Sequence, residues 1–222
     1  MATRLVKEWR FINSPRLSAK ENMAIDESLF LTCRDVPIFR LYEWEEDSFT
    51  IGRFQKIQEI KNPQIYGTNW AKRITGGGLL LHGFDISYAV ILPISQIGKR
   101  SVKESYEYLC GFVLNFYQDL GFSPAWAKDI FANSLSKSFF CQEGFEPYDI
   151  IINDKKIGGN AQRRTKDFIL QHGSIPLKRD ERQHSGTSLE EFGIKLDPSE
   201  AKKMLMRSFE KTFKILLKEE RV

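Results

Sequence analysis

One apolar run limits what this chain can fold into more than any other segment does. Residues 86–93, ISYAVILP, are almost entirely apolar and end at a proline. A short run with so few polar side chains is typical of a strand that is buried on both faces. The run therefore predicts an interior strand whose sheet carries further layers of structure on each side.

Three helices with recognisable starts can supply those layers. Ser18 and Glu21 form a capping-box pattern that predicts a helix to about residue 32, and Ser101 with Glu104 predicts a second helix. A third long helix is expected after Asp197-Pro198, because proline favours the first helical position.

Strand-like segments intermix with these helices along the chain. They are expected at 37–44, 48–53, 138–140, 148–153 and 167–177, and Asn153-Asp154 is typical of a hairpin turn. No repeat, low-complexity tract or linker marks a boundary. Residues 1–222 are therefore predicted to form one domain of the α/β (α+β) class, a central mixed, largely antiparallel sheet flanked by helices.

Composition argues against several classes of protein. No apolar run approaches the roughly 20 residues that span a bilayer, and the N-terminus lacks a signal-peptide core, so we expect a cytoplasmic protein with no membrane partner. A net charge of +4 is too small to indicate nucleic-acid binding by itself. Three widely spaced cysteines and three separated histidines predict neither a disulfide framework nor a metal site.

The segment KRITGGGLLLH, residues 72–82, places three glycines between a basic run and an apolar one. It matches neither the phosphate-binding loop GxxxxGK[ST] nor the dinucleotide pattern GxGxxG. Glycines at a bend between strands let a ligand lie against bare backbone amides. An acyl chain along the leucines, with its polar head at Arg73, fits this segment, and a strand corner with no ligand fits the spacing equally well.

A second segment of interest follows the predicted hairpin turn. Because side chains alternate along a strand, either Lys155 or Lys156 is expected to point inward. An inward lysine is costly unless it meets an anion or takes part in chemistry. Gly158, Gly159 and Ala161 leave room there for a close approach.

Five stretches in order resemble the lipoate–protein ligase and octanoyltransferase family, which has the biotin/lipoyl ligase fold. They are NMAIDESL (22–29), FRLYEWEEDSFTIGRFQ (39–55), RITGGGLLLH (73–82), KKIGGNAQRR (155–164) and ILQHGSI (169–175). The resemblance implies that Lys156 contacts the acyl carbonyl. It also implies an acyl-binding set made of Arg73, Thr75, Gly76, Gly77, Gly78, His82, Gly158, Gly159 and Ala161.

The family contains two chemistries. A transferase takes an octanoyl group from an acyl-carrier-protein thioester through a cysteine acyl-enzyme and needs no cofactor, whereas a ligase activates free lipoate with ATP and Mg. Both deliver the acyl group to a lysine of a lipoyl-acceptor domain, either a glycine-cleavage H-type protein or a 2-oxoacid dehydrogenase E2 domain. The sequence leaves the acceptor, and the choice of octanoyl or lipoyl, open.

Cys141 favours the transferase. It precedes Tyr148-Asp149 by the distance at which the resemblance places the nucleophile, and thiolate attack on a thioester needs no ATP. Lys156 is expected to favour the thiolate, and amides near Gly76 and Gly77 to stabilise the oxyanion. Cys33 and Cys110 are predicted to be small buried hydrophobes.

Other features point to the alternatives. Gly78 is ligase-like, because cysteine-dependent octanoyltransferases usually carry arginine there, and the basic cluster suits either ATP phosphates or an acidic carrier. The chain leaves no room for the accessory domain of the longer ligases, which favours the transferase. An inactive acyl- or carrier-binding module is a third possibility, opposed by the joint presence of Cys141, Lys156 and the glycine loop.

Three side-chain roles can be stated as expectations. His82 is expected to orient the glycine loop, to touch the acyl head group or to be a satisfied structural residue, and His172 to pair with backbone or neighbouring strands. Replacement of Lys156 by alanine is expected to abolish transfer and leave the fold intact.

Overall fold

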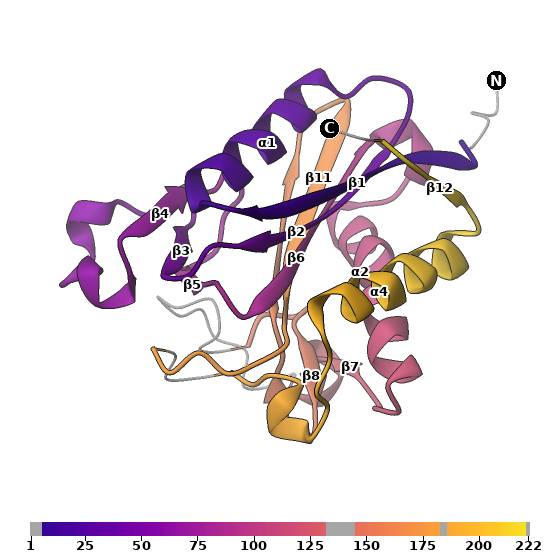
Figure 1. Cartoon of the computed structure of the whole chain (residues 1–222). Coiled ribbons are helices and arrows are strands. Elements are labelled where there is room, and N and C mark those ends of the chain that lie inside the picture. The colour runs from indigo at the N-terminus through magenta and orange to yellow at the C-terminus, as the bar shows by residue number, and fades with distance from the viewer. Residues whose placement is uncertain (1–5, 132–144, 183–185, 221–222) are drawn as a thin grey trace.

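The computed structural model describes residues 6–131, 145–182 and 186–220. Its main feature is a six-stranded sheet in the order β10-β11-β6-β2-β1-β12 (Figure 1). These strands are β1 (Glu8–Leu17), β2 (Ile38–Trp44), β6 (Asp85–Pro93), β10 (Gly159–Arg164), β11 (Phe168–Pro176) and β12 (Leu216–Glu219). The pairs from β10 to β2 are antiparallel and the last two are parallel, so the expected mixed, largely antiparallel sheet is confirmed.

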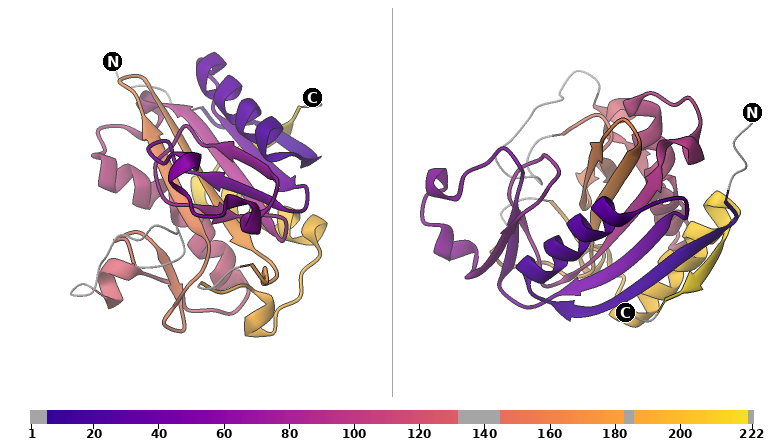
Figure 2. Two further views of the ribbon diagram at one scale, coloured as in Figure 1. Left: turned by 90° about the vertical axis from the view of Figure 1, so that its left-hand side faces the viewer. Right: turned by 90° about the horizontal axis from the view of Figure 1, so that it is seen from above.

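Helices cover both faces of this sheet. Helix α1 (Ala19–Thr32) lies on one face, and α2 (Val102–Asp119) and α4 (Pro198–Phe213) lie together on the other, as Figures 1 and 2 show. The capping boxes at Ser18 and Ser101 are both formed, and the Asp197 carboxylate accepts from the Ser199 N–H. The predicted helix starts are therefore confirmed.

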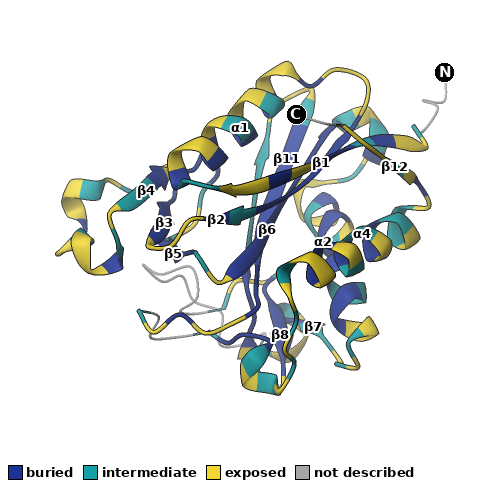
Figure 3. Ribbon diagram, in the orientation of Figure 1, coloured by how far each residue is buried: buried dark blue, intermediate teal, exposed yellow. Residues whose placement is uncertain are grey.

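The strand predicted to be interior is β6. All its residues except Pro93 are buried, and it lies between β11 and β2 (Figure 3). Side chains alternate along its neighbour β2, so Phe39 and Leu41 pack toward α2 and α4 while Tyr42 and Trp44 pack on the α1 side. The α1 side carries the buried polar side chains Asp26, Arg40 and His172, and the site lies there.

Two small sheets complete the fold. One has the order β4-β3-β5 and the other the order β7-β8-β9. Their strands are β3 (Ser48–Ile51), β4 (Asn69–Lys72), β5 (Leu80–Leu81), β7 (Ala125–Trp126), β8 (Ile150–Ile152) and β9 (Lys155–Lys156). Asn153 and Asp154 have φ of 49° and 61°, as a tight hairpin turn requires, so the predicted hairpin is confirmed.

The remaining elements are short. They are helix α3 (Ala127–Ile130) and the 3₁₀ turns η1 (Ile57–Glu59), η2 (Pro63–Tyr66), η3 (Ile94–Ile97) and η4 (Glu190–Phe192). None of the helices in the described ranges has the length and apolar character needed to cross a membrane.

Within the six-stranded sheet, the sequence patterns missed β1, β10 and β12. Strand β1 contains Pro15, and its buried and exposed residues do not alternate regularly. Its ladder with β2 shifts register between Asn13 and Arg16, which interrupts the alternation. Strands β10 and β12 are the two edges of the sheet, so their burial is too slight to give an apolar pattern. The predicted extended segment 138–140 lies outside the described residues.

An aromatic cluster joins the sheet to α4. Phe209 stacks on Phe39 with ring centroids 3.9 Å apart and meets Trp9 and Phe112 edge-on. We expect Phe209→Ala to lower the free energy of unfolding by about 3–5 kcal/mol, because it leaves a cavity in the core. Chemical denaturation followed by far-UV circular dichroism measures this.

The exposed residue Arg207 on the same helix provides the control. Arg207→Ala should change the free energy of unfolding by less than about 0.5 kcal/mol. Equal losses in the two variants would contradict the central place of this cluster in the core.

Candidate active site

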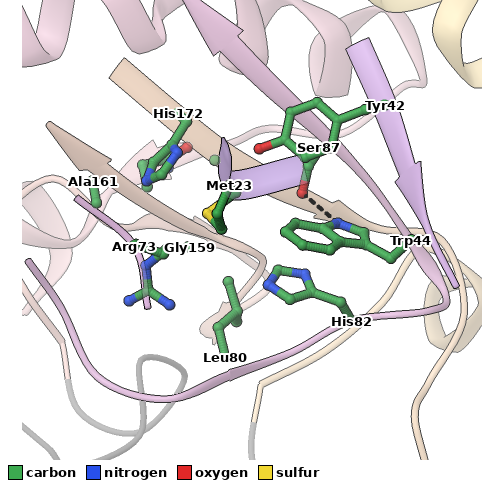
Figure 4. A pocket seen from close by; sticks show the side chains of 12 residues that line it. Met23, Tyr42, Trp44, Arg73, Leu80, His82, Ser87, Gly159, Ala161 and His172 are labelled. Atoms are coloured by element: carbon green, nitrogen blue, oxygen red, sulfur yellow. Dashed lines mark hydrogen bonds between the residues drawn. The ribbon is translucent and has the colours of Figure 1, made fainter. Parts of the chain in front are cut away.

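A cavity opens on the α1 side of the six-stranded sheet. Its empty space is about 330 Å³, including the part open to solvent. Helix α1, strands β2, β6, β10 and β11, and the segment from Arg73 to His82 enclose it (Figure 4). It is lined by Met23, Tyr42, Trp44, Arg73, Leu80, His82, Ser87, Gly159, Asn160, Ala161, His172 and Gly173.

Four of the predicted acyl-binding residues line this cavity, namely Arg73, His82, Gly159 and Ala161. The others, Thr75, Gly76, Gly77, Gly78 and Gly158, are not among its lining residues. The structure thus brings together the ends of the glycine segment and the start of β10, which are far apart in the sequence. Direct contact of Gly76, Gly77 and Gly78 with an acyl group stays a prediction.

The close approach made by these glycines is to other backbone. A Cβ atom on Gly52 would lie 1.9 Å from the Gly77 carbonyl oxygen, and one on Gly158 would lie 2.2 Å from the Ser174 carbonyl oxygen. Gly77 and Gly158 also have φ of 94° and 71°, which disfavours any side chain. A Cβ on Gly76 would meet nothing within 4 Å, so that position has open space beside it.

Arg73 holds the glycine loop, residues 73–78, in shape. Its side chain is buried and donates to the Thr50 hydroxyl at 2.6 Å, to the Gly78 carbonyl at 2.7 Å and to the Gly76 carbonyl at 3.2 Å. One guanidinium therefore fixes both ends of the glycine triplet. In Figure 4 the Arg73 side chain lies at the edge of the cavity, next to Leu80.

His82 links this loop to a buried carboxylate. Its Nδ1 lies 3.0 Å from Asp85 Oδ2 and its Nε2 lies 2.9 Å from Thr50 Oγ1. Because Arg73 already donates to the Thr50 hydroxyl, we infer that this hydroxyl donates to Nε2 and that the Nδ1–H donates to Asp85. His82 is then neutral, and its ring stacks on Trp44 with centroids 3.8 Å apart.

His172 makes a second link of the same kind. Its Nδ1 lies 3.2 Å from Asp26 Oδ2, and its Nε2 lies 2.6 Å from the hydroxyl oxygen of Thr75 in the glycine loop. The expectation that His172 pairs with backbone or neighbouring strands is therefore wrong, since these partners are side chains of α1 and the loop. Asp26 is itself paired with Arg40 at 2.7 Å and accepts from the Tyr42 hydroxyl.

The order hydroxyl, imidazole and carboxylate is also that of a nucleophile with its base. Thr75, however, is only 1% exposed and is not among the residues that line the cavity. A substrate carbonyl cannot reach such a hydroxyl, so we interpret the Thr75–His172–Asp26 chain as a support for the loop.

The inward lysine is Lys156, and Lys155 is exposed, as the alternation along the hairpin predicted. The Lys156 ammonium lies 2.6 Å from Asp149 Oδ2, and both side chains are almost fully buried. The anion that an inward lysine requires is thus Asp149, which directly precedes β8. Burial raises the pKa of Asp149 above its ordinary value, and the Lys156 ammonium opposes that shift.

This ion pair changes one expectation about Lys156. Removing one partner of a buried pair leaves an uncompensated charge and typically costs about 3–5 kcal/mol. The side chain is therefore expected to stabilise the fold as well, so that Lys156→Ala should lower stability in addition to its effect on transfer. Lys156 is not among the residues that line the cavity.

Two of the three cysteines are buried in the fold. Burial raises the pKa of the Cys33 thiol to about 11 and that of the Cys110 thiol to about 12. Both are thus confirmed as small buried residues, and neither forms a thiolate near neutral pH. The proposed nucleophile Cys141 lies outside the described residues.

Metal ligands do not gather in the described parts of the chain. Within residues 6–131, 145–182 and 186–220, no group of three or more His, Cys, Asp or Glu side chains is placed to hold an ion.

His82 should make stability depend on pH. Burial, followed by repulsion from Arg73 and His172, lowers its pKa below 6.5 against the opposing effect of Asp85. Since the unfolded chain then binds a proton that the folded chain does not, this contribution is present above about pH 6.5 and is lost as the pH falls through the lower, folded-state pKa. Urea unfolding at pH 7.5 and 5.5 measures it.

His82→Gln serves as the comparison for this effect. The variant should lose less stability than the wild type between the two pH values, because it has no imidazole to protonate. The same pH dependence in both proteins would show that His82 is not the group responsible.

Comparisons with known proteins agree with this geometry. Residues 18–210 match the family described as lipoyl protein ligase A/B catalytic domain. The chain is 32% identical over 189 residues to octanoyltransferase LipM of Exiguobacterium sibiricum, a match that covers 80% of this chain and 68% of the relative. It is 35% identical over 185 residues to octanoyltransferase LipM of Lysinibacillus sphaericus, covering 78% of this chain and 67% of the relative.

A solved structure shares the fold. Protein Ta0514 of T. acidophilum, a putative lipoate protein ligase with bound lipoic acid, superposes with a TM-score of 0.80 at 21% identity. The match covers 97% of this chain and 90% of that one. At this level of identity the likeness concerns the fold alone.

Proposed function

The chain belongs to the lipoyl protein ligase A/B catalytic domain family, and on that premise we propose that it is an octanoyltransferase. It moves an octanoyl group from an acyl-carrier-protein thioester to a lysine of a lipoyl-acceptor domain. The observation that carries the proposal is the match to curated octanoyltransferases, at 32% and 35% identity over about four fifths of the chain.

Cys141 is proposed as the nucleophile. The chain has three cysteines, and burial removes Cys33 and Cys110 from consideration. The Cys141 thiolate attacks the thioester carbon, the carrier thiolate leaves and takes a proton, and an octanoyl thioester forms on Cys141. The acceptor amine then attacks this thioester, an amide bond forms, and the Cys141 sulfur is released.

Lys156 and Asp149 are proposed to act on this exchange as a pair. A buried ammonium near the thiolate lowers the cysteine pKa, and Lys156 is held in place by the Asp149 carboxylate. Asp149 also accepts from the Glu146 N–H at 2.7 Å, which fixes its position in turn. Asp149 is therefore a positioning residue in this account.

The cavity is proposed to hold the octanoyl chain. Met23, Leu80, Ala161 and the face of Trp44 supply apolar walls, which suit a saturated chain. The loop amides at Gly76 and Gly77 are proposed to face the oxyanion of the tetrahedral intermediate. Support for that role comes from the way Arg73 and Thr75 hold the loop.

The proposal also covers the domain, the compartment, the cofactor requirement and the acceptor. Residues 1–222 act as one catalytic domain in the cytoplasm, and transfer needs no cofactor. The acceptor is either a glycine-cleavage H-type protein or a 2-oxoacid dehydrogenase E2 domain, and lipoyl is the other acyl group considered.

Intact mass spectrometry tests the covalent step. After incubation with an octanoyl-carrier-protein thioester and no ATP, the wild type should gain the mass of one octanoyl group. Cys141→Ala should gain none, because the attacking sulfur is gone, and Cys33→Ala should gain as much as the wild type.

The ligase alternative predicts a different result. It requires no adduct from the thioester, together with loading of an acceptor domain from free lipoate only when ATP and Mg are present. Gly78, the ligase-like residue of the glycine loop, is the feature that favours it. Failure of both reactions would leave an acyl- or carrier-binding module.

Lys155 and Lys156 form a matched pair for testing the ammonium. Lys156→Met should lower the rate of adduct formation at pH 7 by about 100-fold or more, which corresponds to losing a charged partner of the thiolate. Lys155→Met, on the exposed side of the same hairpin, should stay within about twofold.

A stability control accompanies this pair, since Lys156→Met leaves Asp149 buried without its ammonium. The double variant Asp149→Asn/Lys156→Met removes both charges and should recover much of the lost stability without recovering the rate. Recovery of the rate together with the stability would contradict a chemical role for Lys156.

A further inference from the structure

Positive charge gathers where β10 ends and α2 begins. The segments 99–104 (KRSVKE) and 163–167 (RRTKD) contain six basic and two acidic residues, a surplus of four. That surplus equals the formal net charge of the whole chain, +4, so the rest of the sequence is close to neutral. We call the six basic residues the β10 basic surface; they are Lys99, Arg100, Lys103, Arg163, Arg164 and Lys166.

The two segments form one surface. Arg164 donates to the Arg100 carbonyl at 3.1 Å and to the Ser105 hydroxyl at 3.3 Å, which ties the end of β10 to the first turn of α2. Figure 2 shows the β10–β11 hairpin beside the start of α2. Lys99, Lys103 and Lys166 are exposed around this junction, and the Lys166 side chain is 90% exposed.

This surface reaches the cavity. Side chains alternate along β10, so Arg163 lies on the same face as Ala161, which lines the cavity. Arg163 also donates to the Ile74 carbonyl at 3.3 Å, beside Arg73 of the glycine loop. A partner that covers the basic surface would therefore sit next to the opening through which an acyl chain must enter.

A charged edge strand has a simpler explanation, because lysine and arginine on an edge discourage pairing with another sheet. That explanation applies only to β10, which is an edge strand of the six-stranded sheet. Here the charge continues onto α2, where Val102 is 59% exposed among the basic side chains. A mixed basic and apolar surface of this kind suits a folded acidic partner.

We propose that the β10 basic surface docks the acyl donor, an acidic carrier protein that presents its thioester on a phosphate-containing arm. This inference rests on the proposed octanoyl transfer. The donor is favoured over the acceptor by charge: the phosphodiester and the acidic face of a carrier are attracted to the surface, whereas the target lysine of an acceptor is itself a cation.

Binding to an inactive protein tests docking separately from transfer. Octanoyl-carrier protein is titrated into Cys141→Ala, with and without Lys103→Glu/Lys166→Glu, and Kd is read by fluorescence anisotropy. The double reversal should raise Kd about tenfold or more at low salt, and the difference should shrink at high salt, because exposed charges are screened. Lys195→Glu/Lys203→Glu, at two exposed positions just before and within α4, should stay within about twofold.

Kinetics with two donors tests the same claim in the active protein. With Cys141 present, Lys103→Glu/Lys166→Glu should raise KM for octanoyl-carrier protein by a similar factor and leave KM for octanoyl-pantetheine unchanged, since the small donor has no protein surface to dock. Loss with both donors would overturn the proposal, as would a rise in KM for the acceptor instead.

An unchanged Kd in the Lys103→Glu/Lys166→Glu variant would also overturn the inference, because the basic side chains would then serve only to discourage pairing at the sheet edge. The proposed function fails by a separate result, namely wild-type protein that transfers octanoyl from neither donor. The binding measurement stands in that case, because it uses a protein that performs no transfer.

Discussion

Two buried carboxylates, Asp26 and Asp85, hold the site together. Each binds the Nδ1 of a histidine, and each histidine faces a threonine hydroxyl through its Nε2. The two hydroxyls, Thr75 and Thr50, then fix the glycine loop, one directly and the other through Arg73. The shape of the loop is therefore set by the polar core beneath it and not by its own sequence alone.

Such burial is stable only because both carboxylates are fully partnered. Burial alone would raise the pKa of Asp26, but Arg40 and His172 outweigh that effect and hold the pKa below its ordinary value. Burial would also raise the pKa of Asp85, but His82, Ser174 and the Gly83 N–H outweigh that effect and hold the pKa below its ordinary value. A buried charge without such partners would cost several kcal/mol, so the network can lose few members before the α1 side of the sheet is disturbed.

Local patterns were enough to predict much of the fold. The interior strand β6, the capped helices α1 and α2, and the hairpin that turns Lys156 inward each depend on a few neighbouring residues, and all are present. Strands β1, β10 and β12 were missed because their side chains are only partly buried, and β1 and β12 also pair with each other from opposite ends of the chain. Edge strands give little periodic signal for this reason.

Only some of the site residues could be predicted from the sequence. Arg73, His82, Gly159 and Ala161 were expected and line the cavity, whereas Asp26, Asp85 and Asp149 were assigned no role. The inward lysine did imply an anion, so Asp149 was within reach of that argument. The His172 link was not, because Thr75, His172 and Asp26 come from three segments that only the folded sheet brings together.

The most direct test of the account is a crystal structure of the protein after reaction with an octanoyl thioester. The account predicts continuous electron density from the Cys141 sulfur into the cavity, with the acyl chain between the Trp44–His82 pair and Ala161. An octanoyl group bound elsewhere, or a chain in this cavity that ends in a free carboxylate next to a nucleotide, would contradict it.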